Sequence, residues 1–224
     1  MIDTIRPARP DWAIVDFNGV LGLQPTTRDW QELAKASGWT GSVAELQHEF
    51  WDRRAAFDLG EVTAEQFWAP LIGPGASVGE VADLDADMWL RIDPYVMAIL
   101  HRARRSGTRL VMLSNAPEPV AQRIADSDWA GLFEDLVFSC RIKANKPAVQ
   151  AYRAALTCVG EATPAEVLMI DDRADNCVAA RALGMETHHF RGHHHRLANE
   201  LGLNTSPEQP RALAQGAAVE AGLS

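Results

Sequence analysis

Cysteine is scarce in this chain of 224 residues. The three that occur, Cys140, Cys158 and Cys177, are odd in number and have no paired spacing of the metal-binding kind. This usage favours reduced, buried thiols over disulfides. No apolar run approaches the roughly 20 residues that a membrane span needs, and the first seven residues lack the charged-then-apolar plan of a signal peptide. We therefore expect a cytoplasmic protein without a membrane partner.

Positive charge is also in short supply. Lys and Arg number 21 against 30 Asp and Glu, which leaves a formal net charge of −9. Because phosphate backbones attract a surplus of Lys and Arg, we expect no nucleic-acid partner. The apolar content of 47% and the charged content of 23% are instead those of an ordinary globular protein. The length suits one generous domain, or one domain with an inserted subdomain.

Four short apolar runs each end in polar residues, as buried strands of a parallel sheet do. The runs are 12–15 before Asp16, 109–113 before Ser114, 135–138 before Ser139, and 167–170 before Asp171. Helix-like segments separate the later runs, at 117–129, 148–159 and 175–183, and a further strand is expected at 185–190. This alternation predicts an α/β fold with a parallel sheet.

Residues 25–93 interrupt the alternation with a helical pattern. Ser42 with Glu45, and Thr63 with Gln66, have the spacing of capping boxes and predict two helix starts; a further helix is expected at 79–90. We interpret the tryptophans of this segment as packing anchors, with stacking on a ligand as the alternative, because large aromatics mostly supply core area. They are five of the seven in the chain: Trp30, Trp39, Trp51, Trp68 and Trp89.

The predicted organisation is an α/β core at 1–24 and 94–203 with a helical insertion at 25–93. The segment 204–224 is rich in Ala, Pro, Gln and Gly and lacks a strong apolar face. We expect it to be an exposed short helix or disordered.

Three aspartates follow predicted strands: Asp16, Asp171 and Asp172. Ligands of open parallel sheets bind outside the carboxyl ends of the strands, so the fold would gather these acids into one crevice. There they would repel each other unless a cation were bound. Hard carboxylate oxygens select Mg²⁺, which usually also binds water and substrate phosphate.

Further candidates join this crevice. Lys146 adds positive charge, which suits an anionic substrate and the ionised form of Asp16. Ser114 and the backbone N–H groups that follow it, from Asn115 on, can donate hydrogen bonds to phosphate oxygens. An ionised aspartate that attacks phosphorus is a known covalent strategy.

Four motifs in this order resemble those of the haloacid dehalogenase-like superfamily. They are Val15-Asp-Phe-Asn-Gly-Val-Leu21, Leu113-Ser-Asn115, Lys146-Pro147 and Ile170-Asp-Asp-Arg-Ala-Asp-Asn176. The resemblance covers roughly residues 11–202, and the insertion is similar to the helical C1 cap of the family's subfamily I. It implies a Rossmann-like core in which the strand before Asp16 is central, between the second and fourth strands.

The resemblance also implies roles for the site residues. Asp16 would be the nucleophile, and Ser114 and Lys146 would hold the transferred phosphoryl group. Asp171 would bind Mg²⁺ with Asp16, and Asp172 would support the metal directly or through water. The backbone carbonyl of Asn18 would be a further metal ligand. A phosphorylated small molecule would be the substrate.

Asn18 departs from the family pattern. Family phosphatases carry an aspartate there, which protonates the leaving alcohol and activates water; an amide cannot trade protons near neutral pH. The favoured prediction is therefore a Mg²⁺-dependent phosphohydrolase that is slow or restricted to good leaving groups. One alternative is a 2-haloacid dehalogenase, which the pair Ser114-Asn115 favours and the pair Asp171-Asp172 opposes. Another is a catalytically weak binding or regulatory protein.

A few other residues of the sequence are weaker candidates for the site. The histidines of 188–195 are interpreted as a solvated loop rather than a metal site, with His188 and His189 on opposite faces of a strand. In the insertion, the candidates for the roof of the site are His48, Arg53, Arg54 and Asp58, although a solvated face is the favoured role of the two arginines. Arg173 suits a surface salt bridge as well as a substrate contact. The sequence does not predict an oligomeric state.

Overall fold

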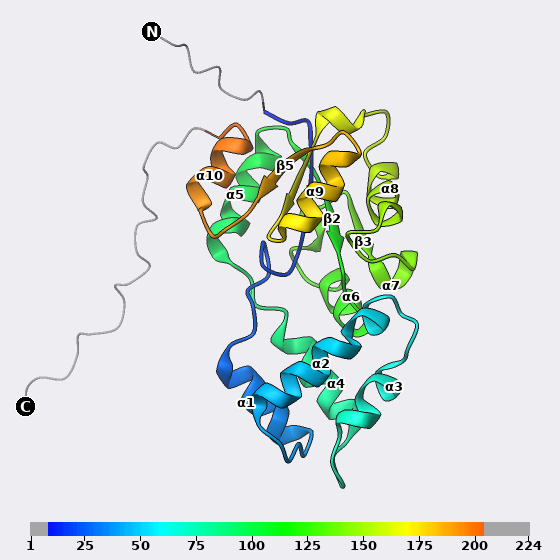
Figure 1. Cartoon of the computed structure of the whole chain (residues 1–224). Helices are drawn as coiled ribbons and strands as arrows, with labels where there is room; N and C mark the ends of the chain where they lie inside the picture. Colours follow the sequence, from blue (N-terminus) through cyan, green and yellow to red (C-terminus); the bar gives the residue numbers. More distant parts are fainter. Residues whose placement is uncertain (1–8, 204–224) are drawn as a thin grey trace, which may run out of the picture.

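The computed structural model of the chain describes residues 9–203, so the predicted tail at 204–224 lies outside the described residues. Five parallel strands form one sheet in the order β3-β2-β1-β4-β5 (Figure 1). The prediction of an α/β fold with the strand before Asp16 at its centre is confirmed. The strands are β1 Trp12–Val15, β2 Arg109–Ser114, β3 Asp135–Phe138, β4 Val167–Asp171 and β5 Glu186–His189.

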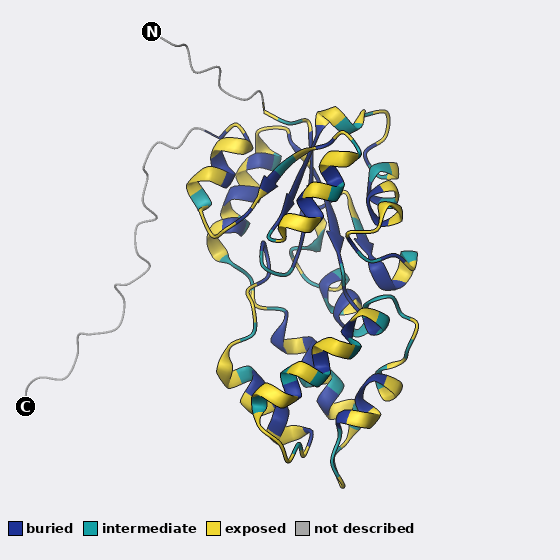
Figure 2. Cartoon of the chain, in the orientation of Figure 1, coloured by how far each residue is buried: buried dark blue, intermediate teal, exposed yellow. Residues whose placement is uncertain are grey.

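Both faces of the central strand are buried, which explains its unbroken apolar run. Ala13 and Val15 point into one core cluster, together with residues of α5 (Pro94–Arg105) and α10 (His194–Glu200). Trp12 and Ile14 point into the other cluster, with residues of α8 (Val149–Thr157). Side chains alternate between the faces of a strand, so a strand covered on both sides has no polar stripe. Figure 2 shows the inner strands β1, β2 and β4 as almost continuously buried.

The remaining helices of this part also follow strands. The predicted helix at 117–129 is too long: α6 stops at Ala125, and the hydroxyl of Ser127 bonds to the carbonyl of Ile124, a local bond that competes with helix continuation. The other elements are α6 Glu118–Ala125, α7 Ser139–Ile142, α9 Ala174–Ala182, and the 3₁₀ turns η2 Ala130–Leu132 and η3 Pro164–Glu166.

Between β1 and α5 the chain forms a separate group of helices below the sheet (Figure 1). Both predicted capping boxes are present, at Ser42 with Glu45 and at Thr63 with Gln66. In each box, the side chain of the first residue accepts a hydrogen bond from the backbone N–H of the fourth. The side chain of the fourth residue accepts one from the backbone N–H of the first. The elements are α1 Thr27–Ala36, α2 Val43–Asp58, α3 Ala64–Trp68, the 3₁₀ turn η1 Ala69–Leu71, and α4 Val78–Met88.

The tryptophans of this helical insertion are mostly packing residues, as predicted. Trp30, Trp68 and Trp89 are buried and surround the ring of Phe50. Trp51 is the exception, because its side chain is 52% exposed at the edge of the same aromatic cluster. Packing alone therefore does not account for Trp51.

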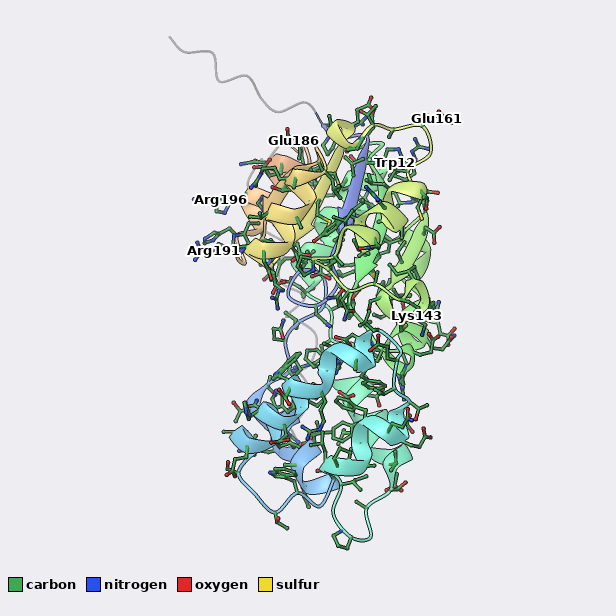
Figure 3. The ribbon with its side chains drawn as sticks, turned by 45° about the vertical axis from the view of Figure 1, so that its right-hand side comes forward. Trp12, Lys143, Glu161, Glu186, Arg191 and Arg196 are labelled. Carbon is green, nitrogen blue, oxygen red and sulfur yellow. The ribbon has the colours of Figure 1, made fainter. Side chains whose placement is uncertain are left out.

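Three hydrogen bonds fasten the end of α2 to the region around α7. Lys143 Nζ donates to the Gly60 carbonyl at 2.8 Å, and Asn145 Nδ2 donates to the Ala55 carbonyl at 2.9 Å. The hydroxyl of Ser139 donates to the carbonyl of Asp58 at 2.5 Å. Figure 3 shows Lys143 where the sheet part meets the helical insertion. These bonds fix the position of α2 above the carboxyl ends of the strands.

The three cysteines are free; Cys140 and Cys177 are buried and Cys158 is half-buried. Burial raises the pKa of all three thiols, so they stay protonated near neutral pH. Within residues 9–203, the helices fall short of the length and apolar character needed to cross a membrane.

Candidate active site

Asp16 follows β1 directly and lies at the carboxyl end of the sheet. Its backbone N–H bonds to the Ile170 carbonyl of β4 at 2.9 Å, and the Phe17 N–H donates to its Oδ1 at 2.7 Å. Burial raises the pKa of this carboxyl to about 7, and the nearby Asp171 carboxylate adds to the rise. The ammonium of Lys146 acts in the opposite direction but does not offset the desolvation.

Lys146 joins the acids of the crevice. Its buried Nζ lies 2.8 Å from Asp16 Oδ1 and 2.7 Å from Asp171 Oδ2. Asn115 holds the backbone of this lysine on both sides: its Nδ2 donates to the Lys146 carbonyl at 3.0 Å, and its Oδ1 accepts the Lys146 N–H at 2.8 Å. The side chain of Asn115 thus positions the backbone of Lys146, and a catalytic role for Asn115 stays a prediction.

The acidic pair after β4 divides into a buried and a half-buried carboxylate. Asp171 has no exposed surface, and its Oδ1 accepts bonds from the Arg173 N–H and Asn176 Nδ2, both at 2.9 Å. Asp172 is half-buried. Burial, and next the Asp171 carboxylate, raise the pKa of Asp172, which reflects repulsion between the two acids.

Three polar atoms near this crevice are buried without a hydrogen-bond partner among the described residues: Ser114 Oγ, Asn18 Oδ1 and Asn176 Oδ1. An unpaired buried polar group is costly, so such atoms often mark a place where a ligand completes the bonding. A hydroxyl donor and an amide oxygen beside Asp16 suit an oxyanion and a cation respectively.

Gly19 lets the acidic pair approach the loop after β1. Its φ is +83°, and a methyl group on its Cα would collide with the carboxylate of Asp172. The loop is tight, with the Gly22 N–H bonded to the Phe17 carbonyl at 2.7 Å. Glycine therefore supplies both the left-handed backbone and the space for Asp172.

A cavity of about 240 Å³ opens between the strand ends and the helical insertion. It collects most of the predicted site residues, whereas Ser114 and Asp171 do not line it. Gln24 and Asn176 line it without having been predicted as site residues. Trp51 and Trp89 also line it, as the alternative of ligand stacking requires. Its lining residues are Asp16, Asn18, Gln24, Trp51, Arg54, Asp58, Trp89, Asn115, Lys146, Asp172, Arg173 and Asn176.

The roof of this cavity, which we define as Trp51, Arg54, Asp58 and Trp89, comes from α2 and the residue after α4. The first three have the spacing i, i+3 and i+7, which places them on one face of a helix. That spacing was readable in the sequence and would have separated Arg54 from Arg53.

The prediction of a solvated role is wrong for Arg54, which is 3% exposed. Its Nε donates to Asp58 at 2.7 Å, and its Nη1 lies 3.5 Å from Asp85. Burial raises the pKa of both carboxyls, and the guanidinium opposes the rise. Its planar group also lies 5.2 Å from the centre of the Trp89 ring. A buried cation needs such partners, and here it has two acids and aromatic faces.

The other roof candidates lie away from the cavity. His48 is exposed, and Arg53 pairs with Glu49 one turn earlier on α2. Arg173 lies at the rim, where it forms two hydrogen bonds with Asp175, at 3.1 and 2.7 Å. It therefore forms a salt bridge and lines the cavity, and its contact with substrate stays a prediction.

The histidine segment behaves partly as predicted. His188 is buried and His189 is exposed, on opposite faces of β5. The loop prediction is wrong from His194 onward, because α10 begins there and His194 Nε2 lies 2.9 Å from Asp93 Oδ2. His189 Nε2 lies 2.9 Å from the carbonyl of Asp172, at the edge of the site.

The residues of the crevice fit a divalent cation. Oxygen atoms of Asp16, Asp171 and Asp172 lie within 4.8 Å of one another. Lys146 is the only cation that pairs with them within the described residues, so the group retains surplus negative charge. An all-oxygen set of this kind suits Mg²⁺.

A sequence model of the haloacid dehalogenase-like hydrolases matches residues 11–184. The chain belongs to this family. It is 26% identical over 179 residues to the sesquiterpene phosphatase astK of Aspergillus oryzae, across 77% of this chain and 86% of that protein.

Solved structures of family members share the fold of this hydrolase. The HAD family enzyme BT-2542 of Bacteroides thetaiotaomicron, in complex with magnesium and inorganic phosphate, has a TM-score of 0.69 and 20% identity, over 81% of this chain and 94% of that one. The L-2-haloacid dehalogenase RSc1362 has a TM-score of 0.65 and 16% identity, over 88% and 99%. Identities this low show the fold alone, so the choice between a phosphatase and a dehalogenase depends on the site.

Proposed function

We propose that this haloacid dehalogenase-like hydrolase is a Mg²⁺-dependent phosphohydrolase that acts on a phosphorylated small molecule. The observation that carries the proposal is the group of Asp16, Asp171 and Asp172, whose oxygens lie within 4.8 Å of one another with one lysine between them. The similarity to a phosphatase and the likeness to a magnesium–phosphate complex support it.

In the first step, a carboxylate oxygen of Asp16 attacks phosphorus. The bond from phosphorus to the substrate oxygen breaks, and its electron pair leaves with the alcohol oxygen. Lys146 and the hydroxyl of Ser114 stabilise the charge on the phosphoryl oxygens, which is the main task of a protein in phosphoryl transfer. Mg²⁺ held by Asp16, Asp171, Asp172 and the carbonyl of Asn18 would neutralise phosphoryl charge.

In the second step, water attacks phosphorus of the aspartyl-phosphate. The bond from phosphorus to Asp16 breaks and restores the carboxylate, inorganic phosphate leaves, and the water proton passes to solvent. Asn18 cannot accept this proton or deliver one to the leaving alcohol. We infer that both proton transfers use solvent, which makes good leaving groups such as acyl phosphates the faster substrates.

We further propose that residues 25–93 act as a cap over the site, with the core formed by residues 1–24 and 94–203. The cavity lies between these two parts, and its roof comes from the insertion. A cap of this kind excludes water and contacts the part of the substrate beyond the phosphoryl group.

Removal of divalent metal is expected to abolish phosphate release from acetyl phosphate and 4-nitrophenyl phosphate. Without the cation the three acids repel both each other and the substrate. The measurement is phosphate release in EDTA and after addition of excess Mg²⁺. Release that ignores EDTA would contradict the metal-dependent mechanism, and halide release from 2-haloacids without phosphatase activity would favour the dehalogenase alternative.

Gly19→Ala is expected to weaken the apparent affinity for Mg²⁺ about 10- to 100-fold, because the new methyl group displaces Asp172. Gly75→Ala is the matched control: its φ is +84°, close to that of Gly19, but open space surrounds its Cα. Both variants should lose stability, by about 1–3 kcal/mol of left-handed strain. The measurement is the Mg²⁺ dependence of the rate beside thermal unfolding. Equal Mg²⁺ affinities in the two variants would show that the position of Asp172 does not matter.

A further inference from the structure

The positive charges around the cavity are already paired within the protein. Besides Lys146, the lining cations are Arg54 and Arg173. Arg54 has Asp58 and Asp85 as partners, and Arg173 has Asp175. The two lining arginines thus have three carboxylate partners, and both guanidinium groups are already paired before a second anionic group of a ligand could reach them.

The roof also presents apolar surface. Trp51 is half exposed beside Trp89, with ring centres 5.7 Å apart, and both rings line the cavity. An isolated exposed aromatic needs no explanation. Trp51 differs because it shares a helix face with Arg54 and Asp58, the two charged residues of the roof. Its ring extends the wall of the same cavity that holds Asp16.

We propose that the roof selects phosphomonoesters whose leaving group is apolar and carries no second anionic group. This inference rests on the proposed phosphohydrolase function and adds the substrate class. The Trp51 ring covers the apolar part of the leaving group, which gains by leaving water. A carboxylate or second phosphate at the same place meets Asp58 without a free cation, and desolvation of such an unpaired charge is costly.

The test uses benzyl phosphate and 4-carboxybenzyl phosphate. Their leaving groups are alike except for the remote carboxylate, so intrinsic reactivity changes little. We expect kcat/KM to be at least about tenfold higher for benzyl phosphate, because a like charge opposite Asp58 is strongly unfavourable. Equal values would overturn the inference while leaving the phosphohydrolase function intact.

Two variants test which roof residues select the substrate. Trp51→Ala should lower kcat/KM for benzyl phosphate about 3- to 10-fold more than it lowers kcat/KM for the small substrate acetyl phosphate. Tyr95→Ala is the control, since Tyr95 is a 57% exposed aromatic on α5 outside the cavity. Asp58→Asn removes one partner of Arg54 and should reduce the discrimination against the carboxylate; Asp83→Asn, an exposed acid of α4, should not. If Asp58→Asn does not fold, the exposed Trp51 variant carries the test.

A binding experiment distinguishes failure of this inference from failure of the proposed function. Benzylphosphonate and 4-carboxybenzylphosphonate, which cannot be hydrolysed, are titrated calorimetrically in the presence of Mg²⁺. Tighter binding of benzylphosphonate, which lacks the second anionic group, supports the inference even if no phosphate ester is turned over, an outcome that would refute the phosphohydrolase function alone. Equal binding, or no binding of either compound, overturns the inference.

Discussion

Asp16→Asn is expected to reduce phosphate release by a factor on the order of 10⁴–10⁶, the range typical of loss of a nucleophile. An amide at this position cannot attack phosphorus, and it no longer contributes negative charge to the proposed metal site. The measurement is kcat on acetyl phosphate at saturating Mg²⁺. Trapping of a phosphorylated protein in the wild type, and its absence in the variant, would identify the intermediate directly.

The same substitution should leave the fold in place. Asparagine has the shape of aspartate, and Lys146 keeps Asp171 as a partner at 2.7 Å. Burial raises the pKa of the Asp16 carboxyl, which means that the folded protein disfavours its ionised form. Loss of this charge therefore costs the native state little electrostatic stabilisation. Asp172→Asn is a useful comparison, because it removes a charge from the same crevice but leaves the nucleophile. Turnover of Asp16→Asn at the wild-type rate would show that another residue attacks the substrate.

Asn18→Asp is expected to increase kcat on alkyl phosphates by about 10²–10⁴-fold, the usual contribution of general acid–base catalysis. The new carboxyl would stand beside other acids and would be partly buried, and both conditions raise its pKa. A raised pKa keeps a proton available for the leaving alcohol near neutral pH. The measurement compares benzyl phosphate with acetyl phosphate in the two proteins.

Acetyl phosphate provides the control for this variant. Its leaving group is a carboxylate that needs no proton, so its hydrolysis should gain much less than that of benzyl phosphate. A uniform gain on both substrates would point to a change in metal binding rather than in proton transfer. An unchanged or lower rate on benzyl phosphate would show that Asn18 suits another reaction of this fold.

Local patterns were sufficient for the strands and the strand-end residues. Unbroken apolar runs predicted β1 and β4, since strands buried on both faces carry no polar stripe. The parallel sheet then brings Asp16 and Asp171 together, because the carboxyl ends of its strands share one edge. The capping boxes at Ser42 and Thr63 were also readable, since each depends on two residues three positions apart.

The charge partners that lie far apart in the sequence were decided only by the tertiary structure. The sequence predicted a solvated role for Arg54, because nothing nearby in the sequence shows that Asp85, 31 positions later, lies against it. The sequence predicted a packing role for Trp51, because helical periodicity shows which face of the helix a residue occupies but not how far its neighbours cover it. Periodicity is a property of one element, whereas burial and charge pairing arise between elements. The sequence alone therefore predicted the acids and lysine of the crevice, and packing of the insertion decided the character of the roof above them.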